Sequence, residues 1–513
     1  MMLDSTAFAE KQEYFYKGKL SLLAFIASMI FVSCYPTKPI SRKKHDLDTE
    51  VGNILAYPPF KTASFGFYAI DLNSGEEISA YQPDIALKPA STQKLITTAA
   101  ALEILGPDFT FETKLAYTGD LSQENGYLNG NLLLIGGGDP SLGSKYFEQT
   151  AGKQFLNEFV NKIKDYGIDS VSGRIIADAR YFDWDIIPPT WSWQNIGQYY
   201  GASANGLAIY DNYFSILFNT FDYGNTTLIT GIRPFIEGLK LTNYVVADSI
   251  SYDNAYVFGA PYSNRRTLTG ELPVRRTNYV VEAATPDPAY LAALQLDSAL
   301  KANNISVNQK ATTIRRIVES GAKNNLAGFR VFYTKRSVSL KEIIEQTNIH
   351  SINLFAEHCL LQLAGNLGGK KQTVPATDSL MSFWAQKGMD TQGMSLNDGS
   401  GLSHYNAVTP RQMVFVLDYM KNSSAHFKEF YSSLAVGGRS GTLENMFKGS
   451  SAEGNIRAKS GTVTRGKAYA GYLTSASGRE IAFSMIVNNF SGSSDEAKAK
   501  LEELMTALSD FNK

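Results

Sequence analysis

The tetrapeptide Lys459-Ser460-Gly461-Thr462 is the chain's only lysine-serine/threonine-glycine box, and it lies among residues that favour β-structure. Three β-like runs follow one another there, at 456–458, 468–474 and 481–487. A lysine on an edge strand offers a cation to a carboxylate, and the serine hydroxyl adds a hydrogen bond. Gly461 lets another backbone approach closely. The related Ser440-Gly441-Thr442 is set aside because Arg439 replaces the lysine.

A second box is found by following the S-x-x-K pattern. It occurs four times, at Ser41/Lys44, Ser91/Lys94, Ser298/Lys301 and Ser320/Lys323. Only Ser91 opens a long apolar helix, predicted over 91–105. There the serine gains from free backbone N–H groups, and the i, i+3 spacing places Lys94 on the same face. A buried lysine has a lowered pKa and can serve as a base. The alternative is that Ser91 is only an N-cap.

A third box, Ser351-Ile352-Asn353, precedes a predicted amphipathic helix. The Ser351 hydroxyl can relay a proton from Lys94, and the Asn353 amide can hold both a substrate backbone and Lys94. The alternative is a helix N-cap followed by a buried asparagine. The same pattern occurs without such a helix at Ser203–Asn205, Ser306–Asn308 and Ser395–Asn397.

The three boxes, in this order, make up the signature of penicillin-recognising serine enzymes. Ser351 follows Ser91 by 260 residues (351 − 91), which resembles the class C low-molecular-mass penicillin-binding proteins. That is the D-alanyl-D-alanine carboxypeptidase/endopeptidase family, whose transpeptidase fold carries inserted domains. Four further stretches resemble it: Gly136-Gly137-Gly138-Asp139-Pro140, Tyr200-Gly201-Ala202, Asn397 to Ser403 with Val408-Thr409-Pro410, and Ser440-Gly441-Thr442-Leu443.

The resemblance implies an α/β (α+β) fold of the β-lactamase/transpeptidase type, an antiparallel sheet flanked by helices with a large, mostly-β insertion. It places the catalytic domain at 51–111 and 336–513 and one or two inserted domains at 112–335. It implies catalysis by Ser91, Lys94 and Ser351, with substrate binding by Asn353, Lys459, Ser460, Gly461 and Thr462. The backbone N–H groups of Ser91 and Thr462 would form an oxyanion hole. Expected partners are peptidoglycan stem peptides and β-lactam inhibitors, with neither cofactor nor metal.

Composition excludes several other classes of function. The chain has 513 residues, 44% apolar and 19% charged, and a net charge of −1, so nothing favours nucleic acid. Five histidines make no H-E-x-x-H motif. Two cysteines, Cys34 and Cys359, allow no disulfide framework. No G-x-S-x-G is present, and the sequence indicates no oligomeric state.

The N-terminus is typical of an export signal. Three lysines precede a 13-residue apolar run at 20–32, which is short for a membrane span. The run ends at Phe31-Val32-Ser33-Cys34, which resembles a lipobox although Phe31 replaces an aliphatic residue. We therefore predict a signal segment over 1–34, a lipid anchor at Cys34, a polar tether over 35–50 and a cell-envelope or periplasmic location. The alternatives are a plain cleaved signal and an uncleaved anchor.

Two other kinds of function remain open. One is a β-lactamase or esterase on the same fold, against which Ser351 and the long gap between boxes argue. The other is a non-catalytic peptidoglycan-binding protein, against which the intact Ser91, Lys94 and Lys459 argue.

Overall fold

The computed structural model describes residues 47–322 and 328–512, so Cys34 and the signal segment lie outside the described residues. One antiparallel sheet joins the two ends of this range, in the order β17-β18-β19-β20-β1-β2. Strand β1 pairs along its whole length with β20, from Ser64 opposite Asn488 to Asp71 opposite Ile481. The strands are β1 (Ser64–Asp71), β2 (Glu77–Tyr81), β17 (Ala435–Val436), β18 (Arg457–Val463), β19 (Gly466–Thr474) and β20 (Glu480–Asn488).

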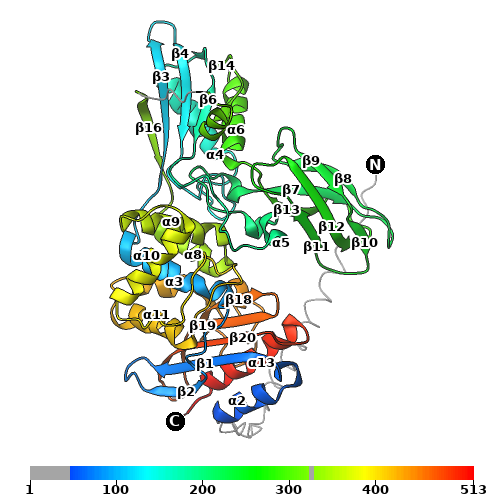
Figure 1. The fold of residues 1–513 in the computed structure, drawn as a ribbon, viewed down its shortest axis with the longest axis vertical. Helices are drawn as coiled ribbons and strands as arrows, with labels where there is room; N and C mark the ends of the chain where they lie inside the picture. The colour runs from blue at the N-terminus through cyan, green and yellow to red at the C-terminus, as the bar shows by residue number, and fades with distance from the viewer. Residues whose placement is uncertain (1–46, 323–327, 513) are drawn as a thin grey trace, which may run out of the picture. The chain divides into compact units, whose positions relative to one another are not determined.

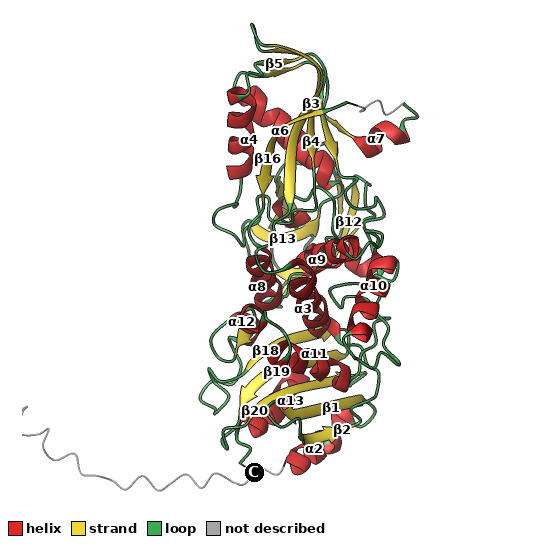
Figure 2. Ribbon diagram, turned by 90° about the vertical axis from the view of Figure 1, so that its left-hand side faces the viewer, coloured by secondary structure: helices red, strands yellow, loops and turns green. Residues whose placement is uncertain are grey.

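Helices cover both faces of this sheet (Figure 2). Side chains alternate between faces along a strand, so Phe65 and Phe67 of β1 pack against one helical layer and Tyr68 and Ile70 against the other. The first layer holds α2 (Leu47–Ala56) and α13 (Ser494–Ser509). The second holds α3 (Lys94–Leu105), α8 (Leu340–His350), α9 (Asn353–Asn366), α10 (Thr373–Gln386), α11 (Pro410–Asn422) and α12 (Phe427–Ser432).

Helix α2 begins at Leu47, inside the stretch 35–50 that we predicted to be a tether. Leu47, Val51 and Ile54 recur at helical spacing and are buried in the core shared with α13. Burial of these apolar side chains stabilises the segment as a helix. The charged residues Asp48 and Glu50 between them make the same segment look polar in the sequence.

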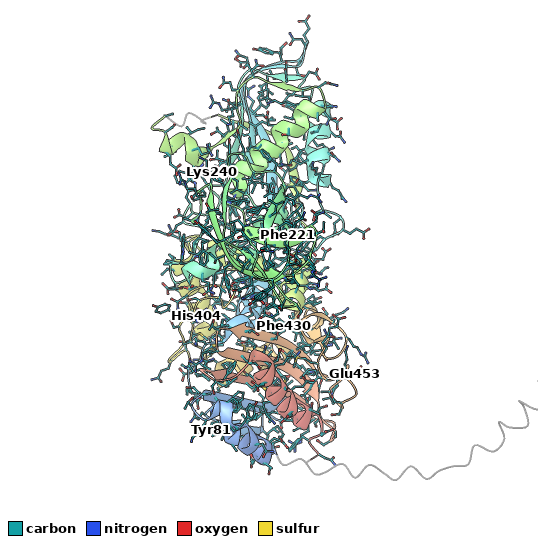
Figure 3. The ribbon with its side chains drawn as sticks, turned by 90° about the vertical axis from the view of Figure 1, so that its right-hand side faces the viewer. Tyr81, Phe221, Lys240, His404, Phe430 and Glu453 are labelled. Atoms are coloured by element: carbon teal, nitrogen blue, oxygen red, sulfur yellow. The ribbon has the colours of Figure 1, made fainter. Side chains whose placement is uncertain are left out.

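The helical layer around α3 has the character of an interior. Every residue of α3 from Lys94 to Leu102 is buried, as expected for a central helix. Trp384, Phe355 and Phe430 are fully buried around it, and Figure 3 shows Phe430 within this layer. A short 3-10 helix, η2 (Ala90–Gln93), precedes α3 and carries Ser91.

The stretch between β3 and β16 forms a seven-stranded sheet of mixed direction, drawn cyan to green in Figure 1. Its strands are β3 (Glu112–Ser122), β4 (Tyr127–Ile135), β5 (Ser170–Val171), β6 (Ile175–Asp178), β14 (Ser306–Val307), β15 (Thr312–Thr313) and β16 (Arg330–Arg336). Helices α4 (Gln154–Asp165) and α6 (Pro288–Ala302) share its core, and α7 (Ile314–Glu319) follows β15.

Two smaller sheets lie within this stretch of the chain. Strands β7 (Tyr213–Asn219), β8 (Leu228–Arg233) and β13 (Tyr279–Ala284) form one. Strands β9 (Lys240–Asn243), β10 (Val246–Asp248), β11 (Asn254–Phe258) and β12 (Arg265–Pro273) form the other, beside the short α5 (Trp193–Ile196). Phe221, labelled in Figure 3, follows β7.

The predicted fold class is confirmed: an antiparallel sheet flanked by helices, interrupted by a strand-rich insertion. Helix α4 was not expected, and it gives the insertion more helix than predicted. No helix in the described ranges combines the length and apolar character needed to cross a membrane.

Phe355 tests how tightly α9 is packed. Its ring is fully buried and lies 5.7 Å from the Phe147 ring and 5.9 Å from the Tyr146 ring. We expect Phe355→Ala to lower the free energy of unfolding by about 3–5 kcal/mol, measured by denaturant titration with circular dichroism. Val374→Ala, at a half-exposed position of α10, should change it by less than about 0.5 kcal/mol. Equal effects of the two substitutions would contradict the packing described.

Candidate active site

Ser91 lies between the helical layer and strand β18. The preceding Ala90 has φ 47°, a left-handed conformation that L-residues seldom adopt. Such strain is typical of functional turns. A Cβ added to Gly461 would lie 2.7 Å from the Pro89 carbonyl oxygen and 2.9 Å from the Ser91 backbone nitrogen. Glycine at 461 is therefore what allows β18 to lie against the serine.

Lys94 is fully buried, and its amine makes three hydrogen bonds. Nζ donates to Ser91 Oγ at 2.9 Å, to Asn353 Oδ1 at 2.6 Å and to the Ser400 carbonyl at 2.8 Å. Burial lowers the pKa of Lys94 to about 7, although the carboxyl groups of Asp398 and Glu357 act in the opposite direction. A neutral amine 2.9 Å from a hydroxyl can accept its proton.

The second box lies on the other side of Lys94. Ser351 ends helix α8 in the left-handed conformation, at φ 61°. Asn353 opens helix α9, and its Nδ2 donates to the Tyr200 carbonyl at 2.7 Å. That bond turns the amide so that Oδ1 faces Lys94. Ser351 and Ser91 both line one cleft.

The third box lies on β18. Its Lys459 is fully buried and donates from Nζ to the Ser460 carbonyl at 2.9 Å. Burial, with a smaller effect of the nearby Lys94, holds the pKa of Lys459 well below its ordinary value. Thr462 lines the cleft. Strand β17 pairs only with Arg457 and Ala458, so β18 has no partner strand on that side from Lys459 onward in the part of the chain that the structure describes.

The cleft has a volume of about 590 Å³. One wall is formed by the three sequence boxes, which contribute Ser91, Ser351 and Thr462 among its lining residues. Another comes from the insertion, where Tyr200 belongs to a stretch already noted for its resemblance and the other lining residues were not singled out from the sequence: Tyr146, Asn195, Tyr199, Asp211 and Tyr213. His404, after the Asp398–Ser403 stretch, also lines it.

Two buried carboxyl groups near Lys94 were also missed. Asp398 Oδ2 accepts from Trp191 Nε1 at 2.8 Å and from the Ser403 backbone N–H at 2.7 Å. Glu357 Oε1 accepts from the backbone N–H of Ser400 at 2.8 Å. Asp398 lay within a stretch already noted for its resemblance. Glu357 gave no signal beyond an amphipathic helix.

His358 fixes the insertion to α9. Its Nε2 accepts from the Asn205 backbone N–H at 3.4 Å, so the ring proton is on Nδ1, which donates to the Gly138 carbonyl at 2.7 Å. Burial lowers the pKa of His358 to about 4, so the ring is neutral at pH 7. The loop Gly136–Pro140 is thereby a structural turn held by the helix. Among the described residues, no cluster of histidine, cysteine, aspartate and glutamate is arranged to hold a metal ion.

Fold and site together define a serine-type peptidase, with a hydroxyl and a buried amine on a transpeptidase-like fold. The model of the D-Ala-D-Ala carboxypeptidase 3 (S13) family matches residues 47–510, and the chain belongs to that family.

Three similar proteins illustrate this. The D-alanyl-D-alanine carboxypeptidase of Actinomadura sp. (strain R39) is 28% identical over 466 residues, covering 87% of this chain and 82% of that protein. Penicillin binding protein 4 from Haemophilus influenzae has the same fold, with a TM-score of 0.76, 22% identity and coverage of 91% and 100%. Its structure complexed with a β-lactam gives a TM-score of 0.72, 22% identity and coverage of 90% and 98%.

Gly461 offers a test of the approach of β18 to Ser91. We expect Gly461→Ala to slow acylation of Ser91 by a penicillin about 100-fold, because its Cβ must push apart the backbone of Pro89 and Ser91. Stopped-flow fluorescence with a labelled penicillin measures this rate. Gly52→Ala, where nothing lies within 4 Å of the new Cβ, is the matched control and should react normally. An unaffected Gly461→Ala enzyme would contradict the proposed contact.

The pKa of Lys94 sets an expected pH dependence. Only the neutral amine can accept the serine proton, so the acylation rate should rise with pH, reach half its plateau near pH 7 and level off above it. One pH unit below that midpoint, the rate should be about tenfold below the plateau. A rate that is flat between pH 6 and pH 8 would show that Lys94 is not the titrating base.

Proposed function

We propose that this chain is a serine-type D-alanyl-D-alanine carboxypeptidase and endopeptidase that cleaves peptidoglycan stem peptides through an acyl-enzyme on Ser91, and that β-lactams acylate the same residue. The observation that carries the proposal is the 2.9 Å hydrogen bond between Lys94 Nζ and Ser91 Oγ, made by an amine whose pKa is about 7. Membership of the D-Ala-D-Ala carboxypeptidase family and the β-lactam complex of the similar Haemophilus protein support it.

Acylation begins at the neutral amine of Lys94. The amine accepts the Ser91 proton while Oγ attacks the carbonyl carbon that precedes a D-alanine or the cross-linked residue. The backbone N–H groups of Ser91 and Thr462 stabilise the oxyanion. Lys94 then returns the proton, through Ser351, to the leaving amine. Water hydrolyses the resulting ester and regenerates Ser91.

Substrate binding is assigned to the strand and to the start of helix α9. The peptide extends along β18, where Ser460 and Thr462 offer hydroxyl groups and Gly461 leaves room for a second backbone. Lys459 is buried behind them and contributes by holding the Ser460 carbonyl. Asn353 completes the set, with its Oδ1 on Lys94 and its Nδ2 on the insertion.

We also propose the organisation and location that the sequence predicts. The catalytic domain comprises 51–111 and 336–513, and 112–335 forms one or two inserted domains that wall the cleft. The protein acts in the cell envelope, with export directed by 1–34 and a lipid anchor at Cys34.

Two alternatives differ in turnover. A β-lactamase or esterase would release the acyl group from Ser91 quickly, and a non-catalytic peptidoglycan-binding protein would form no adduct. The hydrogen-bonded Ser91–Lys94 pair favours an enzyme over a binding protein.

Intact-mass spectrometry with a fluorescent penicillin tests the proposal. We expect one adduct per molecule in the wild type and none in Ser91→Ala, because the hydroxyl of Ser91 is the one bonded to the fully buried amine of Lys94. Ser298→Ala is the matched control, since Ser298 opens another S-x-x-K in the chain, and it should keep the adduct. Release of D-alanine from a D-alanyl-D-alanine peptide should follow the same pattern. A folded wild-type protein without an adduct would refute the acyl-enzyme.

A further inference from the structure

One of the three acceptors of Lys94 belongs to none of the three sequence boxes. It is the Ser400 carbonyl, which lies 2.8 Å from Nζ. The backbone on either side of Gly399 is held by Glu357, which is 2% exposed. Its Oε1 accepts from the N–H groups of Gly399 at 3.0 Å and Ser400 at 2.8 Å, and its Oε2 accepts from Gly399 at 3.0 Å. The Glu357 side chain therefore fixes the peptide unit between Gly399 and Ser400. The next carbonyl along the chain, that of Ser400, accepts the hydrogen bond from Lys94.

Glu357 lies four residues after Asn353 on helix α9, and residues with this spacing share a helix face. Asn353 presents Oδ1 directly to Lys94, while Glu357 acts through the Ser400 backbone. One helix thus sets two of the three acceptors around the amine. Movement of the 398–401 loop would leave the ammonium with an acceptor missing.

A carboxyl group with only a structural role is not expected at the buried position of Glu357. Burying a carboxyl group is unfavourable unless partners compensate. Its two oxygens accept hydrogen bonds from the backbone N–H groups of Gly399 and Ser400. Its neighbours Ala356 and Leu360 on α9 show that apolar residues fill this core.

We propose that Glu357 is a positioning residue of the acylation step, which holds the Ser400 carbonyl against the amine of Lys94. The inference rests on the proposed function, in which Lys94 is the base. The titratable groups that face this pair are Asp398, beside both Lys94 and Glu357, Lys459, beside Lys94, and Cys359, next to Glu357. Burial and Asp398 raise the pKa of Glu357 to about 8.

Two substitutions separate position from charge. Glu357→Asp keeps an ionisable carboxyl group and withdraws its oxygens by one methylene, whereas Glu357→Gln keeps an oxygen in place and cannot ionise. The readout is the acylation rate by a fluorescent penicillin across pH 5 to 9, which gives a plateau rate and the pH of half-plateau. Gln362→Asn, which shortens a buried side chain of the same helix, is the matched control.

We expect Glu357→Asp to lower the plateau rate at least tenfold and Glu357→Gln about threefold. Glu357→Asp should also move the half-plateau to lower pH, because the withdrawn Ser400 carbonyl no longer stabilises the ammonium form of Lys94. Glu357→Gln should keep the half-plateau near that of the wild type, because Glu357, with a pKa of about 8, is largely neutral near pH 7. The Gln362→Asn enzyme should keep both values. A fall of the plateau in Glu357→Gln greater than in Glu357→Asp would overturn the proposal, as would an unchanged half-plateau in Glu357→Asp.

The wild-type protein distinguishes failure of the proposed function from failure of the positioning role of Glu357. If the wild-type protein forms no adduct, the proposed function itself has failed. If the wild type reacts and the Glu357 variants behave like it, only the positioning role is wrong. Should Glu357→Asp not fold, the plateau rate of Glu357→Gln decides alone, and a fall of tenfold or more overturns the proposal.

Discussion

The fully buried amine of Lys94 is the constraint on which the rest of the site depends. Lowering its pKa from 10.5 to about 7 corresponds to about 5 kcal/mol of lost preference for the charged form. The protein keeps the amine in place with three oxygen acceptors, from Ser91, Asn353 and Ser400. Ser91 precedes Asn353 by 262 residues (353 − 91) and Ser400 by 309 (400 − 91), and the pairing of β1 with β20 joins these two parts of the chain in one sheet.

The insertion takes part in that arrangement. Tyr200 accepts from Asn353 and Trp191 donates to Asp398, so segments between β6 and β7 hold both sides of the amine's surroundings. His358 lies on α9, the helix that carries Asn353, and its ring is hydrogen-bonded to the Gly138 carbonyl of the insertion. More than 200 residues lie between the first two boxes, and the entropic cost of closing so long a loop opposes their meeting at one site. Contacts of this kind tie the extra structure to the chemistry.

Sequence patterns predicted the elements with strong periodicity or capping. The helix after Ser91, the helix after Ser351 and the last three strands are all observed. Helix α4 was missed although Phe155, Phe159 and Ile163 carry the i, i+4, i+8 spacing, because glycines and asparagines nearby suggested turns. Glu357 and Asp398 were beyond reach for another reason: the partners of a buried polar group are set by tertiary packing, which local spacing does not reveal.

Strand β18 explains why this fold suits an extended peptide. A strand without a neighbour presents a row of unpaired backbone groups, and proteins usually protect such edges. Here β17 covers only Arg457 and Ala458, and the free edge starts at Lys459, where the serine-bearing turn comes within contact of Gly461. A peptide added to this edge would have its backbone fixed by the strand and its carbonyl brought to Ser91. The short β17 therefore leaves open the part of the edge beside Ser91, which is where the proposed reaction requires a bound backbone.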